Sequence, residues 1–240
     1  MTYCVGLLLN EGMVLLSDTR TNAGLDNIAT YRKMFTFEDP GERVIAILTA
    51  GNLSVTQTTI ARLNDAIEHP DADESSSIMK AVSMLKVAEM VGNTLAQVRQ
   101  EVDHKLAMGQ GAGASMILAG QRAGGDMRVF LIYPEGNFIE ATEDTPFLQI
   151  GEHKYGKPIL DRVVVPDTSL AEGQKAVLLS MDSTLRSNLS VGMPLDLAVI
   201  EKDDCRISMR RRIEAGDEDF RRMSLAWSEA LRDSFLKIDL

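Results

Sequence analysis

Apolar residues open the chain in two nearly continuous runs that a short polar turn separates. Residues 2–20 (TYCVGLLLNEGMVLLSDTR) therefore predict a β-hairpin with its turn at residues 10–12. With a two-residue loop Thr2 would lie opposite Thr21, whereas a three-residue loop would turn Thr2 and Asp18 toward the same face. The sequence leaves this register open, but either arrangement returns Asp18 to the neighbourhood of Thr2.

Hydrophobic periodicity assigns the rest of the chain to further strands and helices. A second hairpin is predicted over 32–51, with an Asp-Pro-Gly turn. Helices are predicted over 54–69, 75–106, 157–164, 170–186 and 219–238, and strands over 113–120, 127–133, 138–142, 196–203 and 205–212. Two of the helices begin with capping-box spacing, Ser54 with Gln57 and Ser169 with Glu172. Strands and helices that occur in runs favour an α+β sandwich over a doubly wound sheet.

We expect a single domain over residues 1–240, because we find no linker or low-complexity segment, with residues 217–240 as a C-terminal helical extension. The last helix carries one apolar stripe on an otherwise charged surface. Its members follow one another at intervals of three, four and four residues: Phe220, Met223, Trp227 and Leu231. The stripe either packs on its own domain or contacts another subunit, where aromatic residues are enriched.

Composition and charge narrow the classes of partner. Hydrophobic residues make up 45% and charged residues 25% of the 240 residues, which suits a globular protein with a sizeable core. The formal net charge of −10 argues against a nucleic-acid partner. Residues 210–212 (Arg-Arg-Arg) form a basic cluster, but the acidic residues that follow it indicate a solvated charged face rather than an anion site. Cys4 and Cys205 form neither a metal-ligand spacing nor a disulfide framework. We expect a cytoplasmic protein without membrane contact, since we find neither a signal-peptide pattern nor a membrane-spanning apolar run.

Most familiar catalytic patterns do not fit this sequence. His69, His104 and His153 lie far apart, which disfavours a metal site, and we find neither a G-x-S-x-G elbow nor a Walker loop. The glycine-rich stretch at residues 109–116 (GQGAGASM) follows a helix and enters a strand, the reverse of a phosphate-binding loop. A close approach of two backbones explains it better.

Thr2 would gain unusual chemistry if Met1 were removed. Its hydroxyl would be a nucleophile, and its α-amino group, with an ordinary pKa of about 7.7–8.0, could accept the hydroxyl proton near neutral pH. A nearby cation would favour the alkoxide and lower the pKa of the amine, and a carboxylate would hold that cation in place. Lys33 and Asp18 are the candidates for these two roles. This chemistry needs no cofactor and no metal.

Four residues stand in a recognisable order: Thr2, Asp18 in SDTRTNAG, Lys33 in YRK and Gly51 in LTAGN. Their order, spacing and surrounding motifs resemble those of the catalytic β subunits of the proteasome, which are N-terminal nucleophile hydrolases. YPEGNF, LQIGEHKYGKPILD and LRSNLSVGMPLDLAVI extend the similarity over nearly the whole chain. The segments MTYCVGLLL, SDTRTNAG and IGEHKYGKPILDR are most similar to the bacterial Anbu subfamily, the ancestral β subunit. The implied fold is a four-layer αββα sandwich, in which helices flank two antiparallel sheets.

The resemblance also implies roles for individual residues. Thr2 would attack and form an acyl-enzyme, the Gly51 N–H would stabilise the oxyanion, Lys33 would supply charge and Asp18 would orient Lys33. The substrate would lie extended along one strand edge and in a side-chain pocket, formed by Arg20, Thr21, Asn22, Ala23, Gly24, Tyr31 and Leu53. Two family positions differ. Asn188 stands where the family has an aspartate, and the loop that supplies a serine near the threonine in the family has Glu-His-Lys at residues 152–154 here.

The function implied is that of a proteasome-type threonine peptidase acting on peptides or unfolded proteins, without a cofactor. The family also implies a ring-like or stacked homo-oligomer that encloses the active site, and the sequence does not identify an unfoldase partner. Two alternatives stay open. The chain could be a catalytically silent scaffold subunit, or it could hydrolyse small amides rather than peptides.

Overall fold

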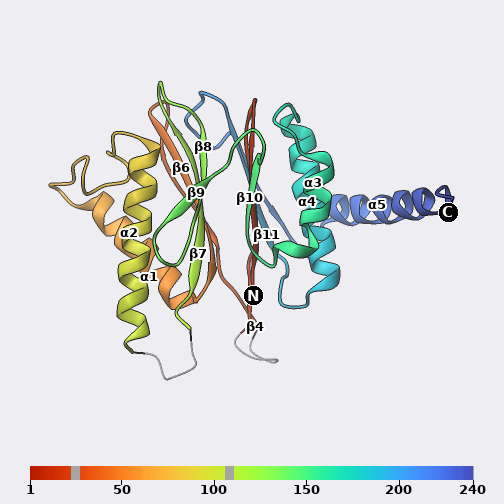
Figure 1. Ribbon diagram of the computed structural model, residues 1–240, viewed down its shortest axis with the longest axis horizontal. Helices are drawn as coiled ribbons and strands as arrows, with labels where there is room; N and C mark the ends of the chain where they lie inside the picture. The colour runs from red at the N-terminus through yellow and green to blue at the C-terminus, as the bar shows by residue number, and fades with distance from the viewer. Residues whose placement is uncertain (23–27, 106–110, 240) are drawn as a thin grey trace.

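The computed structural model describes residues 1–22, 28–105 and 111–239. Two five-stranded antiparallel sheets pack face to face, and helices cover their outer faces (Figure 1). The first sheet has the strand order β10-β1-β2-β11-β12 and the second β5-β6-β7-β8-β9, while β3 and β4 form a small separate ladder. The α+β sandwich predicted from the sequence is therefore confirmed.

The elements have the following bounds. The strands are β1 Tyr3–Leu9, β2 Gly12–Asp18, β3 Arg20–Asn22, β4 Ile28–Thr30, β5 Met34–Asp39, β6 Arg43–Gly51, β7 Ala114–Arg122, β8 Arg128–Ile132, β9 Phe138–Glu140, β10 Phe147–Gly151, β11 Leu195–Glu201 and β12 Met209–Ile213. The helices are α1 Leu53–Glu68, α2 Met84–Asp103, α3 Lys157–Val163, α4 Leu170–Ser187 and α5 Glu218–Leu236, with a short 3-10 helix at His153–Tyr155. Helices α1 and α2 cover the second sheet, α3 and α4 cover the first, and α5 projects away from the body (Figure 1).

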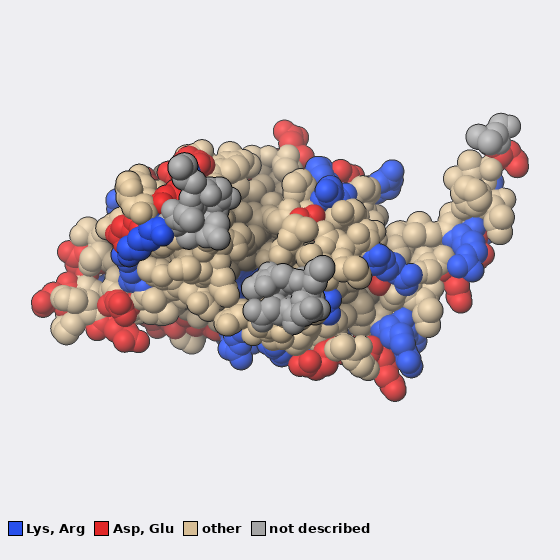
Figure 2. All heavy atoms as spheres, turned by 90° about the horizontal axis from the view of Figure 1, so that it is seen from below, with Lys and Arg blue, Asp and Glu red and all other residues tan. Residues whose placement is uncertain are grey.

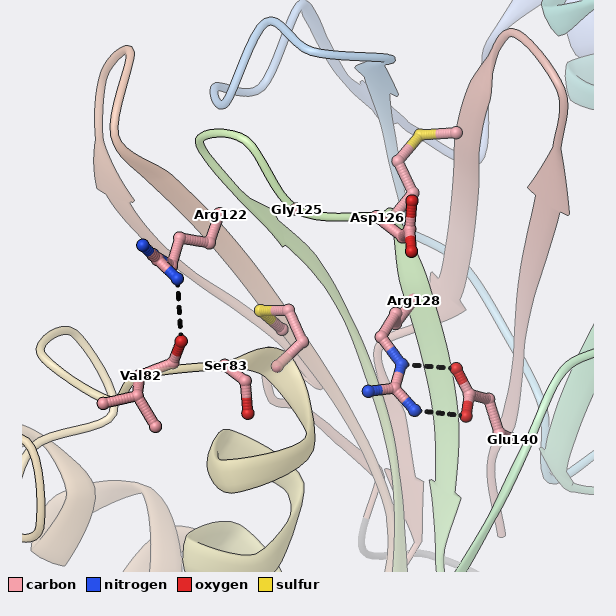
Figure 3. Close-up of a pocket in the computed structure, with 9 residues that line it drawn as sticks. Val82, Ser83, Arg122, Gly125, Asp126, Arg128 and Glu140 are labelled. Atoms are coloured by element: carbon pink, nitrogen blue, oxygen red, sulfur yellow. Dashed lines mark hydrogen bonds and ion pairs between the residues drawn. The ribbon is translucent and has the colours of Figure 1, made fainter.

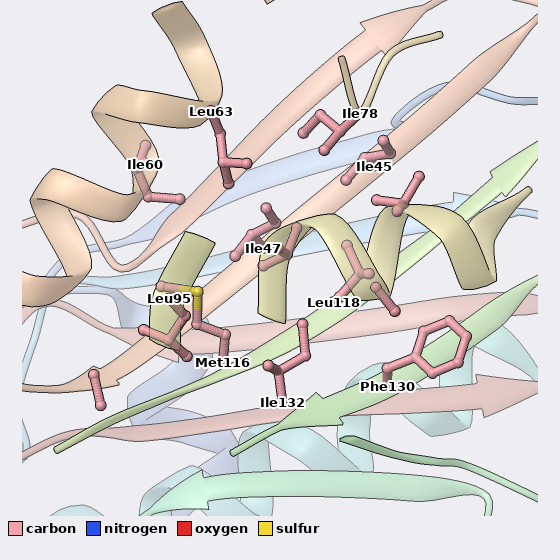
Figure 4. Close-up of a cluster of buried hydrophobic side chains, with 14 of the residues drawn as sticks. Ile45, Ile47, Ile60, Leu63, Ile78, Leu95, Met116, Leu118, Phe130 and Ile132 are labelled. Atoms are coloured by element: carbon pink, nitrogen blue, oxygen red, sulfur yellow. The ribbon is translucent and has the colours of Figure 1, made fainter. Parts of the chain in front are cut away.

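Strands in the middle of the sheets are apolar on both faces, which explains their continuous hydrophobic pattern. In β6, Ile45 and Ile47 face the helices, whereas Ala46 and Leu48 face the other sheet. Three buried clusters result, one between the sheets and one between each sheet and its helices. Figure 4 shows the cluster at α1 and α2, where Leu95 of α2 joins residues of the sheet.

The first hairpin has a register that neither predicted loop gives. The two-residue loop is Asn10–Glu11, and continuing the β1–β2 pairing places Thr2 opposite Thr19 rather than Thr21. Gly12 belongs to β2 and also pairs with β11, whose backbone carbonyl oxygen would lie 2.2 Å from a Cβ at this position. Because the sheet needs a glycine here, a residue that the sequence assigns to the turn lies inside a strand.

Two helices begin at residues other than those predicted. The N-cap of α1 is Asn52, whose Oδ1 accepts a hydrogen bond from the Val55 N–H at 3.2 Å, so the predicted Ser54–Gln57 capping box is wrong. Helix α2 begins at Met84 with Ser83 as its N-cap, nine residues after the predicted start. In both cases the cap is the residue whose side-chain oxygen reaches a free N–H group of the first turn.

Residues 75–82, predicted as the start of the long second helix, form turns. The buried guanidinium of Arg43 donates hydrogen bonds to the carbonyl oxygens of Ile78 and Ala81. These long-range bonds satisfy carbonyl groups that a helix would otherwise satisfy locally, and local periodicity does not reveal them. The predicted end of this helix, residue 106, lies outside the described residues.

The predicted capping box of α4, Ser169 with Glu172, is confirmed. Residues 147–151, over which the hydrophobic pattern predicts neither a strand nor a helix, form the edge strand β10, which pairs with β1. Strands as short as β10, β3 and β4 carry too few residues for a clear period of two. In the described part of the chain, every helix is too short or too polar to cross a bilayer.

Candidate active site

Four predicted catalytic residues adjoin strand ends at one end of the sandwich. The N-terminus lies at this end (Figure 1). Thr2 directly precedes β1 and Asp18 is the last residue of β2, in the first sheet. Lys33 directly precedes β5 and Gly51 is the last residue of β6, in the second sheet. The two sheets therefore contribute to this end together.

Lys33 and Asp18 form a buried ion pair that joins the two sheets. The Lys33 Nζ atom lies 2.8 Å from Asp18 Oδ1, Lys33 is 4% exposed and Asp18 is fully buried. The same ammonium group donates to the carbonyl oxygen of Arg20 at 2.6 Å and to that of Met1 at 3.4 Å. The ammonium group of Lys33 is thus held close to the peptide bond between Met1 and Thr2.

Asp18 is held from three directions. Besides the Lys33 ammonium, its carboxylate accepts hydrogen bonds from the N–H of Tyr3 at 3.1 Å and from the N–H of Gly192 at 3.2 Å. Burial raises the pKa of Asp18 above its ordinary value, whereas Lys33 and the two N–H donors favour the charged form. Such a pair contributes geometry more than folding stability, because desolvation offsets much of its Coulomb energy.

Cys4 is the other strong nucleophile near this end, and its surroundings disfavour the reactive form. Its thiol is fully buried and donates to the carbonyl oxygen of Thr49 at 3.7 Å. Burial raises the pKa of Cys4, and the charge of Asp18 raises it further. The thiol therefore stays protonated and unreactive at neutral pH.

Thr2 is fixed through its backbone. Its carbonyl oxygen accepts a hydrogen bond from the Glu152 N–H at 2.7 Å. It also lies 1.9 Å from where a Cβ of Gly151 would be, and Gly151 has a φ of +79°. Only glycine fits that position. Thr2 is 8% exposed, and within the described residues its hydroxyl has no hydrogen-bond partner, so the oxygen is positioned but not engaged.

Gly51 also occupies a place that only glycine can take. Its φ is +109°, and a Cβ there would lie 2.4 Å from the carbonyl oxygen of Gly113, at the glycine-rich stretch that precedes β7. The following residue, Asn52, donates its N–H to the same oxygen at 2.9 Å. The close backbone approach expected for the glycine-rich stretch is therefore present, and it fixes the end of β6.

Asn188 is engaged by its own loop. Its Oδ1 atom accepts a hydrogen bond from the Ser190 N–H at 2.9 Å, at the C-terminal end of α4. The residue of this loop that reaches the ion pair is Gly192, which sequence reasoning missed because the contact is made by a backbone N–H group. Among the described residues, no hydrogen bond links the Asn188 side chain to Thr2 or Lys33.

Arg20, predicted to contact substrate, is packed against the same loop. Its guanidinium donates to the carbonyl oxygen of Leu189 at 3.1 Å, and its Nε atom would lie 2.1 Å from a Cβ at Gly192. Arg20 therefore supports the loop that supplies the Gly192 N–H to Asp18. This arrangement gives Gly192 a steric reason to be glycine.

The other predicted binding residues belong to segments next to Lys33 and Gly51. Thr21 and Asn22 belong to β3, Tyr31 lies between β4 and Lys33 and is 40% exposed, and Leu53 is the half-buried first residue of α1. Gly24, together with Ala23, lies outside the described residues.

A hollow of about 450 Å³ lies at the other end of the second sheet (Figure 3). Arg128 and Glu140 form a two-pronged ion pair there, and Arg122 donates to the carbonyl oxygen of Val82. The charges of Arg128 and Glu140 thus neutralise each other, and Arg122 is bound to the backbone. These interactions are typical of a structural contact rather than of a catalytic site.

Comparison with known proteins places this geometry in a family. A family model described as proteasome subunit matches residues 2–200. Anbu from Hyphomicrobium sp. strain MC1 is 49% identical, with a TM-score of 0.90, over 99% of this chain and 98% of that chain. Anbu (ancestral β-subunit) from Yersinia bercovieri is 41% identical, with a TM-score of 0.91, over 99% of this chain and 98% of that chain. The chain belongs to the proteasome family, among the Anbu proteins.

A third Anbu structure, described as the helical assembly of the Anbu complex from Pseudomonas aeruginosa, is 43% identical, with a TM-score of 0.92, over 99% of this chain and 97% of that chain. A comparison with curated proteins gives no match. The family model ends at residue 200, before α5, but the Anbu structures cover 99% of this chain. Helix α5 is therefore shared with other Anbu proteins.

Proposed function

We propose that this Anbu-type subunit is an N-terminal threonine peptidase, in which Thr2 becomes the nucleophile after Met1 is removed. The buried Lys33–Asp18 pair carries the proposal. Two charges withdrawn from water are costly to keep in a protein interior, and this pair lies beside a threonine whose hydroxyl is not engaged. Perturbed charged groups next to a free nucleophile are typical of a catalytic site rather than a packing site.

Removal of Met1 would expose the amine that the reaction requires. The Lys33 ammonium donates to the Met1 carbonyl oxygen, so removal of this residue frees that donor near the new α-amino group. A positive charge there lowers the pKa of the amine and raises its neutral fraction at pH 7. The amine can then take the proton of the Thr2 hydroxyl, directly or through water.

The reaction would proceed in two steps. The Thr2 oxygen attacks the substrate carbonyl, the Gly51 N–H stabilises the oxyanion, and the α-ammonium returns its proton to the leaving amine. Water then hydrolyses the Thr2 ester and releases the acyl half. Lys33 stabilises negative charge on the Thr2 oxygen. Asp18 keeps Lys33 in place, and the N–H groups of Tyr3 and Gly192 hold Asp18 in turn.

We further propose that the subunit works in a homo-oligomer and acts on peptides or unfolded proteins. The relative from Pseudomonas aeruginosa is described as a helical assembly. Assembly would restrict access to Thr2 and favour extended chains, which can add to the β3 edge through backbone hydrogen bonds. The scaffold alternative is supported by Asn188, whose side-chain oxygen is already bound to Ser190.

Two measurements test the enzyme against the scaffold. We expect the intact mass of the purified protein to be short by one methionine, and we expect Thr2→Ala to reduce peptide hydrolysis by at least about a thousandfold, because no other hydroxyl takes its place. Thr30→Ala, an exposed threonine on β4, is the matched control and should leave the rate unchanged. Retained Met1 together with no hydrolysis by the wild type would favour the scaffold, and equal rates for wild type and Thr2→Ala would exclude Thr2 as the nucleophile.

A further inference from the structure

An apolar hollow adjoins residues that flank the candidate nucleophile, on the side away from Lys33. Its volume is about 520 Å³, and it lies between β8 of one sheet and β10 of the other. Two of its lining residues adjoin the catalytic positions: Gly151 touches the Thr2 carbonyl group, and Ser115 pairs with Ala50, the residue before Gly51. The end of the molecule that carries the N-terminus is visibly hollowed between its two halves (Figure 2).

The strand order shows which half of a substrate would meet this hollow. In the first sheet β1 lies between β2 and β10, and in the second sheet β6 lies between β5 and β7. Thr2 and Gly51 therefore separate two flanks, one with β3 and Lys33 and the other with Ser115 and Gly151. If the acyl half of the substrate pairs with β3, the half that leaves as the amine extends toward the hollow.

The lining of the hollow is mostly apolar. The buried residues Phe147, Leu148 and Ile150 contribute to it, together with the half-buried Leu131 and Tyr133. Its polar members that carry no charge are Ser115, Thr145 and Gln149. Such a surface gains free energy by covering an apolar side chain and gives no compensation to a charged one.

Among the described lining residues, the charged or titratable side chains lie at the rim of the hollow. The Lys157 ammonium is paired with Asp161 at 2.5 Å and lies 5.5 Å from the centre of the Phe147 ring, and His153 is exposed. Because Asp161 neutralises Lys157, the rim has little attraction for an acidic residue. The volume is that of a pocket for a small molecule, enough for a bulky side chain.

We propose that this hollow binds the residue that follows the scissile bond, and that the subunit prefers peptides with a large apolar or aromatic residue at that position. The inference rests on the proposed function. When the carbon–nitrogen bond breaks, its electron pair stays on nitrogen, which takes the proton held by the Thr2 α-ammonium. The new amine then leaves with its side chain still in the hollow, so the contact acts on the step that forms the acyl-enzyme.

Matched peptides test the preference. Internally quenched peptides with one common acyl half carry phenylalanine, leucine, glycine or aspartate directly after the scissile bond. We expect kcat/KM to be at least about tenfold higher for phenylalanine and leucine than for glycine and aspartate, the discrimination that an apolar pocket provides. Thr145→Trp, at the exposed rim and at the end of the hollow away from Gly151, should narrow the hollow and bring the ratio closer to one.

The matched control is Thr142→Trp, the same change on the same turn. Thr142 is bridged to Thr145 but does not line this hollow, so its variant should keep the wild-type ratio. Leu131→Ser, which reduces the apolar lining, provides a second variant if Thr145→Trp folds poorly. A ratio near one in the wild type, or an unchanged ratio in both hollow variants, would overturn the inference.

A probe that occupies only the acyl side separates this inference from the proposed function. A peptide epoxyketone forms one bond to the Thr2 hydroxyl oxygen and one to the Thr2 α-amine. It carries no residue after the reacting carbonyl group, so it should add its full mass to the wild type and to all three variants. If the probe adds while the peptide ratio stays near one, the preference is wrong and the N-terminal mechanism stands. If neither addition nor cleavage occurs, the mechanism fails and the preference fails with it.

Discussion

Asp18 contacts more parts of the site than any other catalytic group predicted from the sequence. Its carboxylate binds Lys33 from the second sheet, the N–H of Tyr3 next to Thr2, and the N–H of Gly192 in the loop after α4. Three segments that are remote in sequence therefore converge on one buried charge. A small movement of Asp18 would shift the ammonium group and the start of β1 together.

Removing either charge should separate the role of the pair in catalysis from its role in folding. We expect Lys33→Ala to lose most peptide hydrolysis, since it removes the cation next to the reacting oxygen. Asp18→Asn should lose much of the hydrolysis and also lower the free energy of unfolding by about 3–5 kcal/mol, because it leaves a buried ammonium group unpaired. Urea unfolding and peptide hydrolysis check both effects. The double variant Asp18→Asn, Lys33→Met should regain stability but not activity; recovered activity would remove the pair from the mechanism.

The raised pKa of Asp18 makes a distinct prediction for pH dependence. The Thr2 amine acts as a base only when neutral, so log kcat/KM should fall with unit slope below the pKa of the amine. Burial raises the pKa of Asp18 above that of an exposed aspartate, about 3.9. As pH falls through this raised value the carboxylate takes up a proton and releases Lys33, so the slope should double there.

The doubled slope should appear at a pH at which the protein is still folded, which circular dichroism over the same range would verify. In Asp18→Asn the slope should stay at unity, because the second titrating group is gone. A wild-type profile with unit slope down to the pH of unfolding would show that Asp18 stays charged and that its titration plays no part.

At the scale of elements, the sequence predicts what local patterns encode. Both hairpins and the capped helix α4 rest on neighbouring residues, and the structure contains them. The order of Thr2, Asp18, Lys33 and Gly51 was found through the family resemblance, and the fold brings these residues to one end. The contributions that sequence reasoning missed come from long-range backbone contacts: the Gly192 N–H, the strand β10 and the Gly12 position.

Helix α1 offers a direct test of one such correction. Asn52→Ala should lower the free energy of unfolding by about 1 kcal/mol, because it removes the cap that the Val55 N–H uses. Ser54→Ala, the cap that the sequence predicts, is the matched control and should change stability very little. Since Asn52 follows Gly51, the first change should also reduce peptide hydrolysis. A larger loss of stability in Ser54→Ala would reverse the assignment of the cap.

At the scale of the whole molecule, α5 is the element that the single chain does not account for. Its first half packs near α4, where Arg186 donates to Ser224. Its second half extends from the body with large apolar side chains exposed: Leu231 is 50%, Phe235 74% and Leu236 73% exposed. The buried Nε1 atom of Trp227 has no hydrogen-bond partner among the described residues. Short helices without tertiary contacts are marginal in water, so the outer half of α5 requires a covering surface.

We expect that surface to be a second copy of this chain, in keeping with the proposed homo-oligomer. Leu231 and Phe235 continue the stripe of Phe220, Met223 and Trp227, whereas Leu225 lies two residues from the stripe positions on either side and so faces elsewhere on the helix. The double variant Leu231→Asp, Phe235→Asp should therefore reduce the assembly, and Leu225→Asp, with 57% exposure, should not. Truncation after Gly216 should reduce the size further and leave the sandwich folded. Where the structure describes the chain, Phe220 is the only side chain of α5 in the three buried clusters, and it is only partly buried there. Light scattering gives the size and circular dichroism the fold: a monomeric full-length protein would refute assembly, and an unchanged oligomer after truncation would refute the role of α5.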